Sequence, residues 1–291
     1  MKKTLIALAA LASVSAFAQS SVTLYGVIDM NVAHTATGTA AGTNGNGNSR
    51  FGMTGTEDLG GGLSSTFGVE ANVMPAATTN ESPFGTNRGV FVGLKGGFGT
   101  MVAGTSTLSA AFYTMAAVES TGMANYGFGG GLLSTNLRDT KPALQYTSPT
   151  MNGLTVRASY VMSNNNTAGV GATNILGATY ANGGLTVAGY RADNGATNNQ
   201  MVGAKYNFGP AAAHVMVVDN AGSKTNTYGV SAPLGNFSLF LDHKDDRTTA
   251  NADATIVGGT YNLSKSTFLY AAVNSTKSVA TTTTVGLRKN F

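Results

Sequence analysis

The sequence predicts an all-β fold, a 16-stranded antiparallel transmembrane β-barrel with one long loop folded into the lumen. The chain of 291 residues contains 39 glycines, and only 10% of its residues are charged, a composition that favours strands and turns over helices. Its mean hydropathy is close to zero, as expected when the apolar outer face and the polar inner face of a barrel are averaged. Sixteen strand-like segments follow one another, joined by connections of alternating length.

Residues 1–18 are expected to be a secretory signal peptide that is removed from the mature protein. Lys2-Lys3 precede an apolar core at residues 5–14, and Ala16-Phe17-Ala18 has the small residues of a cleavage site. The alternative is a transmembrane anchor, but the core is shorter than the about 20 helical residues that cross a bilayer. We therefore expect residues 19–291 to form the barrel.

Charge and cysteine content exclude several classes of protein. Removal of the two N-terminal lysines would leave 15 Lys and Arg against 13 Asp and Glu, so the slightly basic balance gives no sign of nucleic-acid binding. The absence of cysteine excludes a disulfide scaffold. After the signal no run of 18 apolar residues occurs, so a membrane role requires strands that close into a barrel.

Each strand-like segment has about the nine to eleven residues that a tilted strand needs to cross the hydrocarbon of a bilayer. An even number of strands is typical of single-chain bacterial barrels. We expect the strands to begin near Val22, Asn48, Leu63, Thr86, Phe98, Lys141, Leu154, Thr173, Leu185, Asn199, Ala211, Thr225, Phe237, Ala254, Thr267 and Val279.

The connections alternate between tight turns and longer polar loops. Gly96-Gly97 and Met151-Asn152-Gly153 are examples of the tight set, which is rich in residues that accept positive φ. The longer set, expected to face the outside, comprises residues 35–47, 75–85, 163–172, 193–198 and 243–253. The charged cluster at residues 242–247 is expected to be a solvated loop tip near lipopolysaccharide, and binding of a divalent ion there is the alternative.

Alternation within the strands predicts which side chains face the lumen. Leu154 and Val156 fall on one side of their strand and Arg157 on the other, while Val202 opposes Lys205 in the same way. An Arg or Lys on the lipid face near the midplane would cost roughly 2 to 4 kcal/mol. Arg157 and Lys205 are therefore predicted to point inward.

Residues 106–138 break this pattern, because they show no period-2 alternation over a length that is uncommon for a loop. The segment carries too many aromatic and aliphatic side chains to remain in water, so we expect it to lie inside the barrel. The flanking residues 89–94 and 101–103 are apolar on both faces. We expect this loop to cover their inner face and a neighbouring subunit or lipid their outer face, with Gly89 and Gly93 as small outward residues.

Several motifs then occur in one order along the chain: Ser21-Val-Thr-Leu-Tyr-Gly-Val-Ile-Asp29, Ser49-Arg-Phe-Gly-Met-Thr-Gly-Thr-Glu-Asp-Leu-Gly-Gly-Gly-Leu63, Asn87-Arg-Gly-Val-Phe-Val-Gly-Leu-Lys-Gly-Gly-Phe-Gly-Thr100, Gln145-Tyr-Thr-Ser-Pro149, Asn152-Gly-Leu154 and Val285-Gly-Leu-Arg-Lys-Asn-Phe291. With these motifs the sequence resembles the general porins of Gram-negative outer membranes, in the form common among β-proteobacteria.

The resemblance implies a homotrimer in the outer membrane, in contact with its lipid and lipopolysaccharide. It implies that residues 106–138 are the third outer loop, folded into the pore as its constriction. The implied function is passive diffusion of small hydrophilic solutes and ions. Phe291 resembles the terminal assembly signal of outer-membrane proteins, whereas Lys289 departs from that signal's usual pattern.

The resemblance also suggests which charges control selectivity. Arg50 and Arg88 fall where the family places arginines of the pore constriction. Alternation places Arg50, Arg88, Arg157, Lys205 and Arg288 inward, against the acids Asp29 and Glu70, and Glu119 is the only acid in residues 106–138. Two positions that are often basic in the family hold Thr105 and Gln145. We therefore predict a weak preference for anions; the alternative for each arginine is a wall residue paired with a loop carbonyl.

No pattern of catalytic or metal-ligating residues is apparent, and no cofactor is expected. His34, His214 and His243 lack the spacing of metal ligands, and no nucleophile and base are paired along the chain. The main alternative function is a plugged outer-membrane barrel that acts as an adhesin or structural protein. A soluble β-sandwich is a weaker alternative, because it would need polar residues at apolar positions such as Leu154 and Val202.

Overall fold

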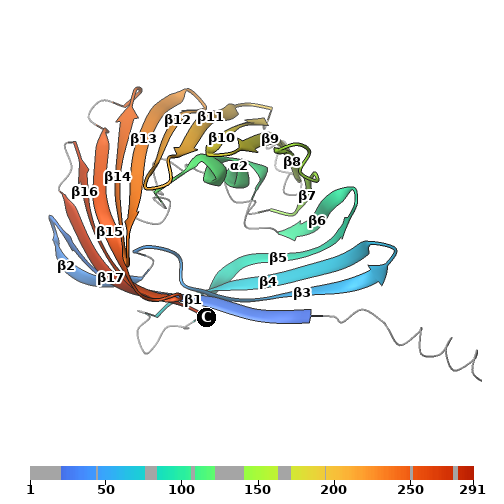
Figure 1. Cartoon of the computed structure of the whole chain (residues 1–291), viewed down its shortest axis with the longest axis horizontal. Helices are drawn as coiled ribbons and strands as arrows, with labels where there is room; N and C mark the ends of the chain where they lie inside the picture. The colour runs from blue at the N-terminus through green and yellow to red at the C-terminus, as the bar shows by residue number, and fades with distance from the viewer. Residues whose placement is uncertain are drawn as a thin grey trace, which may run out of the picture.

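The computed structural model describes residues 21–43, 45–75, 84–105, 109–121, 141–162, 172–193, 195–249, 252–277 and 281–291, with the backbone alone at 84–87. These residues form a ring of antiparallel strands around a central lumen (Figure 1). The expected signal peptide, residues 1–18, lies outside the described residues. No helix in the described ranges is both long enough and apolar enough to cross a membrane.

Sixteen strands make the wall of the ring, and each begins within three residues of its predicted start. They are β1 (Ser21–Thr35), β3 (Arg50–Gly60), β4 (Leu63–Val73), β5 (Phe84–Gly96), β6 (Gly99–Thr105), β7 (Ala143–Thr147), β8 (Leu154–Val161), β9 (Thr173–Asn182), β10 (Leu185–Asp193), β11 (Asn198–Asn207), β12 (Ala212–Asn220), β13 (Ser223–Leu234), β14 (Phe237–Asp246), β15 (Ala254–Ser264), β16 (Thr267–Thr276) and β17 (Thr282–Asn290). The predicted 16-stranded antiparallel barrel is confirmed.

Strand β1 closes the ring, because its first half pairs with β3 and its second half with β17, where Val27 lies opposite Asn290. One residue further on, Phe291 and Gly26 exchange two backbone hydrogen bonds. Gly26 N donates to Phe291 O at 2.9 Å, and Phe291 N donates to Gly26 O at 3.1 Å. The first and last strands, which would be open edges in a flat sheet, are thus paired.

A short additional strand, β2 (Gly38–Thr43), lies within the predicted long connection at residues 35–47. It pairs with the second half of β1, beyond the point where β1 leaves β3. His34 and Thr39 lie opposite each other, and His34 Nδ1 is 2.7 Å from Thr39 Oγ1. The sequence did not predict this strand, which extends the wall locally on one side of the barrel.

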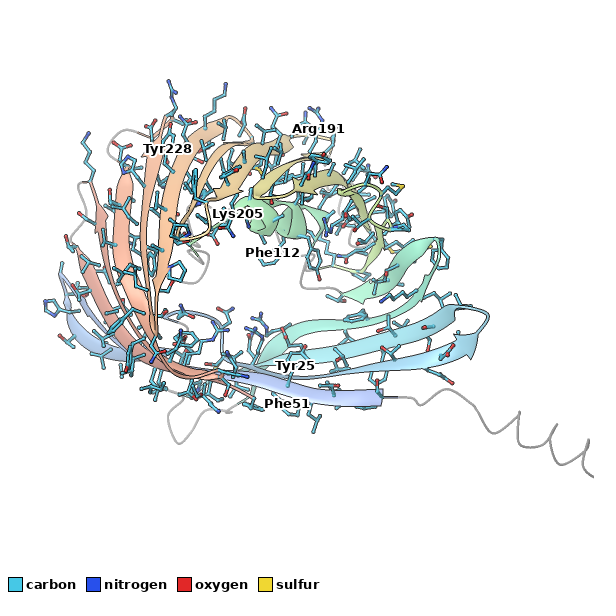
Figure 2. The ribbon with its side chains drawn as sticks, in the orientation of Figure 1. Tyr25, Phe51, Phe112, Arg191, Lys205 and Tyr228 are labelled. Carbon is cyan, nitrogen blue, oxygen red and sulfur yellow. The ribbon has the colours of Figure 1, made fainter. Side chains whose placement is uncertain are left out.

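The two faces of the strands differ as the alternation predicts. Leu154, Tyr160 and Val202 are exposed on the outer surface, whereas Ser159 is buried on the inner one. In Figure 2, Tyr228 lies on the outer side of the barrel and Lys205 on the lumen side. The wall therefore presents an apolar surface outward and a polar one to the lumen, as a barrel in a bilayer requires.

Helix α2 (Ala110–Val118) lies inside the ring, against β8 to β12 (Figure 1). Its N-terminus is capped by Ser109, whose Oγ accepts from Phe112 N at 3.2 Å, and Ser159 Oγ on β8 accepts from Ala110 N at 3.0 Å. The inward location of this part of residues 106–138 agrees with the prediction, but the helix itself was not predicted. Residues 106–108 and 122–138 of the expected constriction loop lie outside the described residues.

Glycines in the wall let α2 approach closely. A Cβ atom at Gly177 of β9 would lie 2.2 Å from Thr114 Oγ1, and one at Gly203 of β11 would lie 3.0 Å from Val118 Cγ2. The helix side that meets the wall is buried and consists of Ala110, Ala111, Thr114, Met115 and Val118. These glycines therefore leave room on the inner face of the wall for the side chains of α2.

Two predictions from the sequence are wrong. Gly89 and Gly93 face the lumen and not the outside, because Val90, Val92 and Leu94 between and beside them are the exposed outer residues of β5. The second error concerns the cluster at residues 242–247. Strand β14 continues to Asp246, and Asp242 is completely buried within it, so that residue does not belong to a solvated loop tip.

Candidate functional site

Two arginines on the inner wall share one carboxylate. Arg88 Nε donates to Glu70 Oε1 at 2.5 Å, and Arg50 Nε lies 3.3 Å from Glu70 Oε2. Tyr25 OH also donates to Glu70 Oε2, at 2.9 Å, and Arg88 Nη1 donates to Asn72 Oδ1 at 3.0 Å. The Arg50 side chain is 26% exposed, whereas that of Arg88 is only 7% exposed. Of the two cations, Arg50 is the one that solutes can reach more readily.

A β-bulge brings Arg88 to this group. In the pairing of β4 with β5, Glu70 lies opposite Gly89 and Ala71 opposite Asn87, so that Arg88 is an extra residue on β5. Strict alternation would put Arg88 on the outer face with Val90. The bulge turns it to the lumen side, beside Gly89, where its guanidinium reaches Glu70.

The α2 side of the lumen contributes a third cation, Arg157. The Arg157 guanidinium of β8 stacks over the Tyr113 ring, with 5.6 Å between its central carbon and the ring centroid. Arg157 Nη1 also donates to Thr179 Oγ1 at 3.4 Å. Figure 2 shows Phe112, the neighbour of Tyr113, pointing from α2 into the lumen.

The Tyr113 phenol is influenced by charges on both sides of the lumen, those of Arg157 and Glu70. Burial raises the pKa of its phenol, the Arg157 guanidinium opposes the rise, and the negative charge of Glu70 adds to it. Glu70 lies on β4 and Tyr113 on α2, which occupy opposite parts of the ring (Figure 1). The charges of the two sides therefore act across the lumen, with Arg157 beside α2 and the Arg50–Glu70–Arg88 group on the other side.

The other predicted lumen residues lie elsewhere. Arg288 on β17 donates to Asn46 Oδ1 at 2.7 Å and stacks over Phe268. Lys205 on β11 lies opposite His214 of β12 in the strand pairing. Glu119 follows α2 and accepts from the backbone and the hydroxyl of Thr121. The structure thus brings Arg50, Glu70 and Arg88 together and leaves Arg157, Lys205, Arg288 and Glu119 at other points of the inner surface.

The Asp29 carboxylate binds a backbone segment and is not accessible to solutes. Its carboxylate accepts from the backbone N–H groups of Gly45, Asn46 and Gly47 at 3.0 to 3.1 Å, and from Tyr270 OH at 2.6 Å. Its side chain is completely buried. This carboxylate therefore does little to offset the positive charge of the lumen.

Phe291 lies at the seam of the barrel. Its ring packs on Gly26, where an added Cβ would lie 2.2 Å from the ring. More than half of the residue, 58%, stays exposed on the outer surface. Its predicted role as an assembly signal remains a prediction, but the terminal residue is clearly part of the wall.

Several contributors to the lumen were not predicted. Tyr25 donates a hydrogen bond to Glu70, and Asn72 accepts one from Arg88. The Arg157 guanidinium stacks over the ring of Tyr113. Alternation placed Tyr25 inward in principle, because Asp29 has the same parity in β1. Asn72 likewise shares the parity of Glu70 in β4, whereas Tyr113 lies in a segment without alternation and had no such signal.

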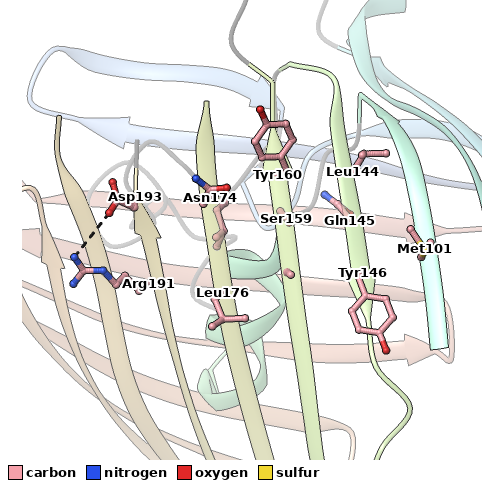
Figure 3. Close-up of a pocket in the computed structure, with 12 residues that line it drawn as sticks. Met101, Leu144, Gln145, Tyr146, Ser159, Tyr160, Asn174, Leu176, Arg191 and Asp193 are labelled. Carbon is pink, nitrogen blue, oxygen red and sulfur yellow. Dashed lines mark ion pairs between the residues drawn. The ribbon is translucent and has the colours of Figure 1, made fainter. Parts of the chain in front are cut away.

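A groove on the outer face of the wall crosses β6 to β10 (Figure 3). Its volume is about 470 Å³, and Leu144, Tyr160 and Leu176 are among the side chains that line it. Arg191 Nη2 and Asp193 Oδ2 form an ion pair of 4.0 Å at its side. Because these side chains point away from the lumen, the groove is separate from the charged groups inside.

A closed ring of sixteen antiparallel strands, apolar outside and charged inside, defines a channel barrel of the outer membrane. The chain belongs to the Gram-negative porin family, whose profile matches residues 4–281. It is thus a multi-pass β-barrel porin of the outer membrane, as the sequence predicted.

Full-length relatives agree with this assignment. The chain is 32% identical over 315 residues to outer membrane porin protein 32 of Delftia acidovorans, covering 93% of this chain and 88% of that protein. It is 28% identical to an outer membrane porin protein of Bordetella pertussis, with both chains covered completely.

Solved porin structures have the same architecture. The anion-selective porin from Comamonas acidovorans superposes with a TM-score of 0.74 and 26% identity, covering 94% of this chain and 100% of that one. A variant of the Rhodopseudomonas blastica porin superposes with a TM-score of 0.77, covering 93% of this chain and 100% of that one. With only 16% identity, the second comparison concerns the fold alone.

Proposed function

We propose that this porin is a channel for passive diffusion of small hydrophilic solutes and ions, with a weak preference for anions. The observation that carries the proposal is the charge of the inner surface, where Arg50 and Arg88 share the carboxylate of Glu70 and Arg157 lies beside α2 without an acidic partner in the described contacts. Charged side chains that line a pore control which ions enter it. The resulting field favours chloride and small organic anions.

The preference is expected to be weak for two physical reasons. Glu70 offsets one arginine, and Arg88 is nearly buried, so that Arg50 and Arg157 carry most of the accessible field. In addition, charges in a wet lumen are screened over about 10 Å at 0.1 M salt. Thr105 and Gln145, which replace basic residues common in the family, add no charge.

Residues 106–138 are proposed to form the constriction. The contact of α2 with the inner faces of β8 to β12 supports this role, because a helix there reduces the cross-section that is left for solutes. The similarity to a porin described as anion-selective supports the direction of the proposed preference.

The test is the reversal potential of the refolded protein in a planar bilayer across a tenfold KCl gradient. We expect stable conductance steps and a modest potential of the sign for anion selectivity. A cation-selective protein would overturn the proposed preference. A folded protein that inserts but never conducts would instead support the plugged adhesin or structural barrel.

We further propose that the porin is a homotrimer that contacts lipopolysaccharide and membrane lipid and has no enzymatic activity. The exposed apolar residues of β1 and β5, such as Leu24 and Val92, would provide subunit or lipid contacts. Conductance steps in groups of three and a trimer band in native gels would support this assembly. Cleavage of residues 1–18 predicts Gln19 as the first residue of the protein isolated from outer membranes, which N-terminal sequencing tests.

A further inference from the structure

Three side chains that can bind metal ions meet where the segment after α2 touches the inner wall. They are Glu119 from that segment, His214 from β12 and Asp242 from β14. One carboxylate oxygen from each acid and one imidazole nitrogen all lie within 4.8 Å of one another. His214 Nε2 and Asp242 Oδ2 are separated by 3.6 Å.

The strand register explains why His214 and Asp242 face each other. Both lie opposite Gly229 of the intervening strand β13, one on each side. A Cβ at Gly229 would lie 2.2 Å from His214 Cε1 and 2.7 Å from Asp242 Oδ2. The absence of a side chain at this position leaves the room in which the imidazole and the carboxylate approach each other.

Two buried atoms of this cluster lack a hydrogen-bond partner among the described residues: His214 Nε2 and Asp242 Oδ1. The side chains of His214 and Asp242 are 0% and 1% exposed. Buried polar atoms in folded proteins are nearly always satisfied by a protein group, water or an ion. The unpartnered imidazole nitrogen lies 3.6 Å from Asp242 Oδ2, too far for a hydrogen bond but close enough for both atoms to bind one ion.

The hydrogen bonding of Thr121 leads to the same conclusion. Its Oγ1 lies 2.5 Å from Glu119 Oε1 and 2.9 Å from Asp242 Oδ2. A threonine hydroxyl has one proton, so it can donate to only one of the two carboxylates at a time. The other short contact requires a further positive charge, either a proton or a cation, between groups that would otherwise repel.

We propose that Glu119, His214 and Asp242 bind a divalent transition-metal cation, for which Zn²⁺ is the best match. One imidazole and two carboxylates are ligands that zinc accepts, at bond lengths of about 2.0 to 2.2 Å, with an open position for water. Ligand atoms of a tetrahedral site then lie about 3.4 Å apart, which the 3.6 Å between His214 and Asp242 already matches. The longer separations close by rotation of the Glu119 side chain.

The other imidazole nitrogen is positioned as a zinc ligand requires. Ser120 Oγ lies 2.8 Å from His214 Nδ1 and accepts its proton in the tautomer that leaves Nε2 free for the cation. The longer contact from Ser120 N, at 3.3 Å, is given up in that tautomer. Lys205, opposite His214 on β11, lowers the affinity of the site because its charge repels the cation.

Zinc in this site would link the segment that follows α2 to two strands of the wall. Ser231 Oγ of β13 already donates to Ser120 O at 2.7 Å, so the segment is positioned before the metal arrives. Through the ion, Glu119 would be linked to His214 of β12 and to Asp242 of β14. The C-terminal end of α2 would thereby be held in place.

The experiment is isothermal titration of Zn²⁺ into untagged, chelator-treated and refolded barrel in detergent. We expect one zinc ion per chain in the wild type. Asp242→Asn, which keeps the size of the side chain, and His214→Ala should each weaken binding by more than about tenfold. His243→Ala is the matched control, because His243 is adjacent in sequence but bonds to Thr255 Oγ1 on β15, and it should bind zinc as the wild type does.

The outcomes separate the site from adventitious binding. Loss of zinc in both cluster variants but not in the control supports the site. No binding by the wild type, or equal binding by all four proteins, overturns it. If the variants do not refold, X-ray absorption of the zinc-loaded wild type decides: one nitrogen and several oxygen neighbours support the site, and a shell without imidazole overturns it. Because the readout is metal content and not conductance, the result is independent of the proposed anion preference.

Discussion

Arg88 donates from Nε to Oε1 of Glu70 at 2.5 Å, and both side chains are largely shielded from solvent. The pair holds β4 and β5 together across a β-bulge on the inner wall. Arg50 approaches the other oxygen of the same carboxylate. A single acid thus positions two cations, and its removal should affect selectivity and stability together.

Replacing the shared acid tests that dependence. Glu70→Gln should make the channel more anion-selective, because the lumen gains one net positive charge. It should also destabilise the barrel by about 1 to 3 kcal/mol, since a charged hydrogen-bond acceptor of a nearly buried arginine is lost. Reversal potentials and urea unfolding midpoints measure the two effects. Glu57→Gln, an equal charge change at an exposed site near the end of β3, should change neither.

The more exposed of the two arginines should dominate selectivity. Arg50→Gln should reduce the anion preference, and the reduction should grow at 0.01 M salt, where the screening length is about 30 Å. Lys289→Gln removes the same charge from a side chain that bonds to Ser266 Oγ on the outer face, and it should leave the reversal potential unchanged. Equal potentials for the Arg50 variant and the wild type would count against Arg50 as a selectivity residue.

Raising the pH should weaken the packing of α2 inside the barrel. A tyrosine whose pKa is raised by folding stabilises the folded state in its neutral form, and that contribution is lost as pH rises above the ordinary value of about 10. Because 42% of Tyr113 is exposed to the lumen, the loss should be small. The unfolding temperature should fall less steeply between pH 9 and pH 11 in Tyr113→Phe than in the wild type. Tyr228→Phe, on the outer face, should behave as the wild type does.

The close packing of α2 on the wall can be tested by adding a side chain where the wall has a glycine. Gly177→Ala places a methyl group against Thr114 and should push the helix from the wall, at a cost of roughly 1 to 3 kcal/mol. We expect noisier conductance and faster proteolysis within residues 110–118. Gly97→Ala, at a turn where an added Cβ meets nothing within 4 Å, is the control. Unchanged noise and proteolysis in Gly177→Ala would show that the helix tolerates displacement.

The strands were predictable from the sequence because a barrel in a bilayer imposes both a fixed strand length and an alternation of faces. Leu154, Leu185 and Phe237 begin their strands where the pattern said they would. The inward direction of Arg157 and Lys205 followed from the same rule. Such features depend only on neighbours in sequence and on the surrounding solvent.

Features that depend on tertiary contacts were not predictable. Helix α2 has nine residues, too few to be stable alone, and it forms because the wall accepts its buried side. Alternation placed Arg88 in the lumen correctly but its neighbour Gly89 outward, because it could not reveal the bulge that puts both residues on the inner face. The cluster of Glu119, His214 and Asp242 was missed because its members are separated by long stretches of chain, and only the strand register makes them neighbours.

The seam between β1 and β17 has a consequence for how the protein is made. Val27 and Asn290 are far apart in sequence, so the ring cannot close until both β1 and β17 have been made and exported. Contacts between such distant residues form slowly, and until they form both end strands are open to pairing with other chains. An unclosed intermediate therefore needs protection during its passage to the membrane. Truncation of even the last few residues should shift its fate from insertion to aggregation.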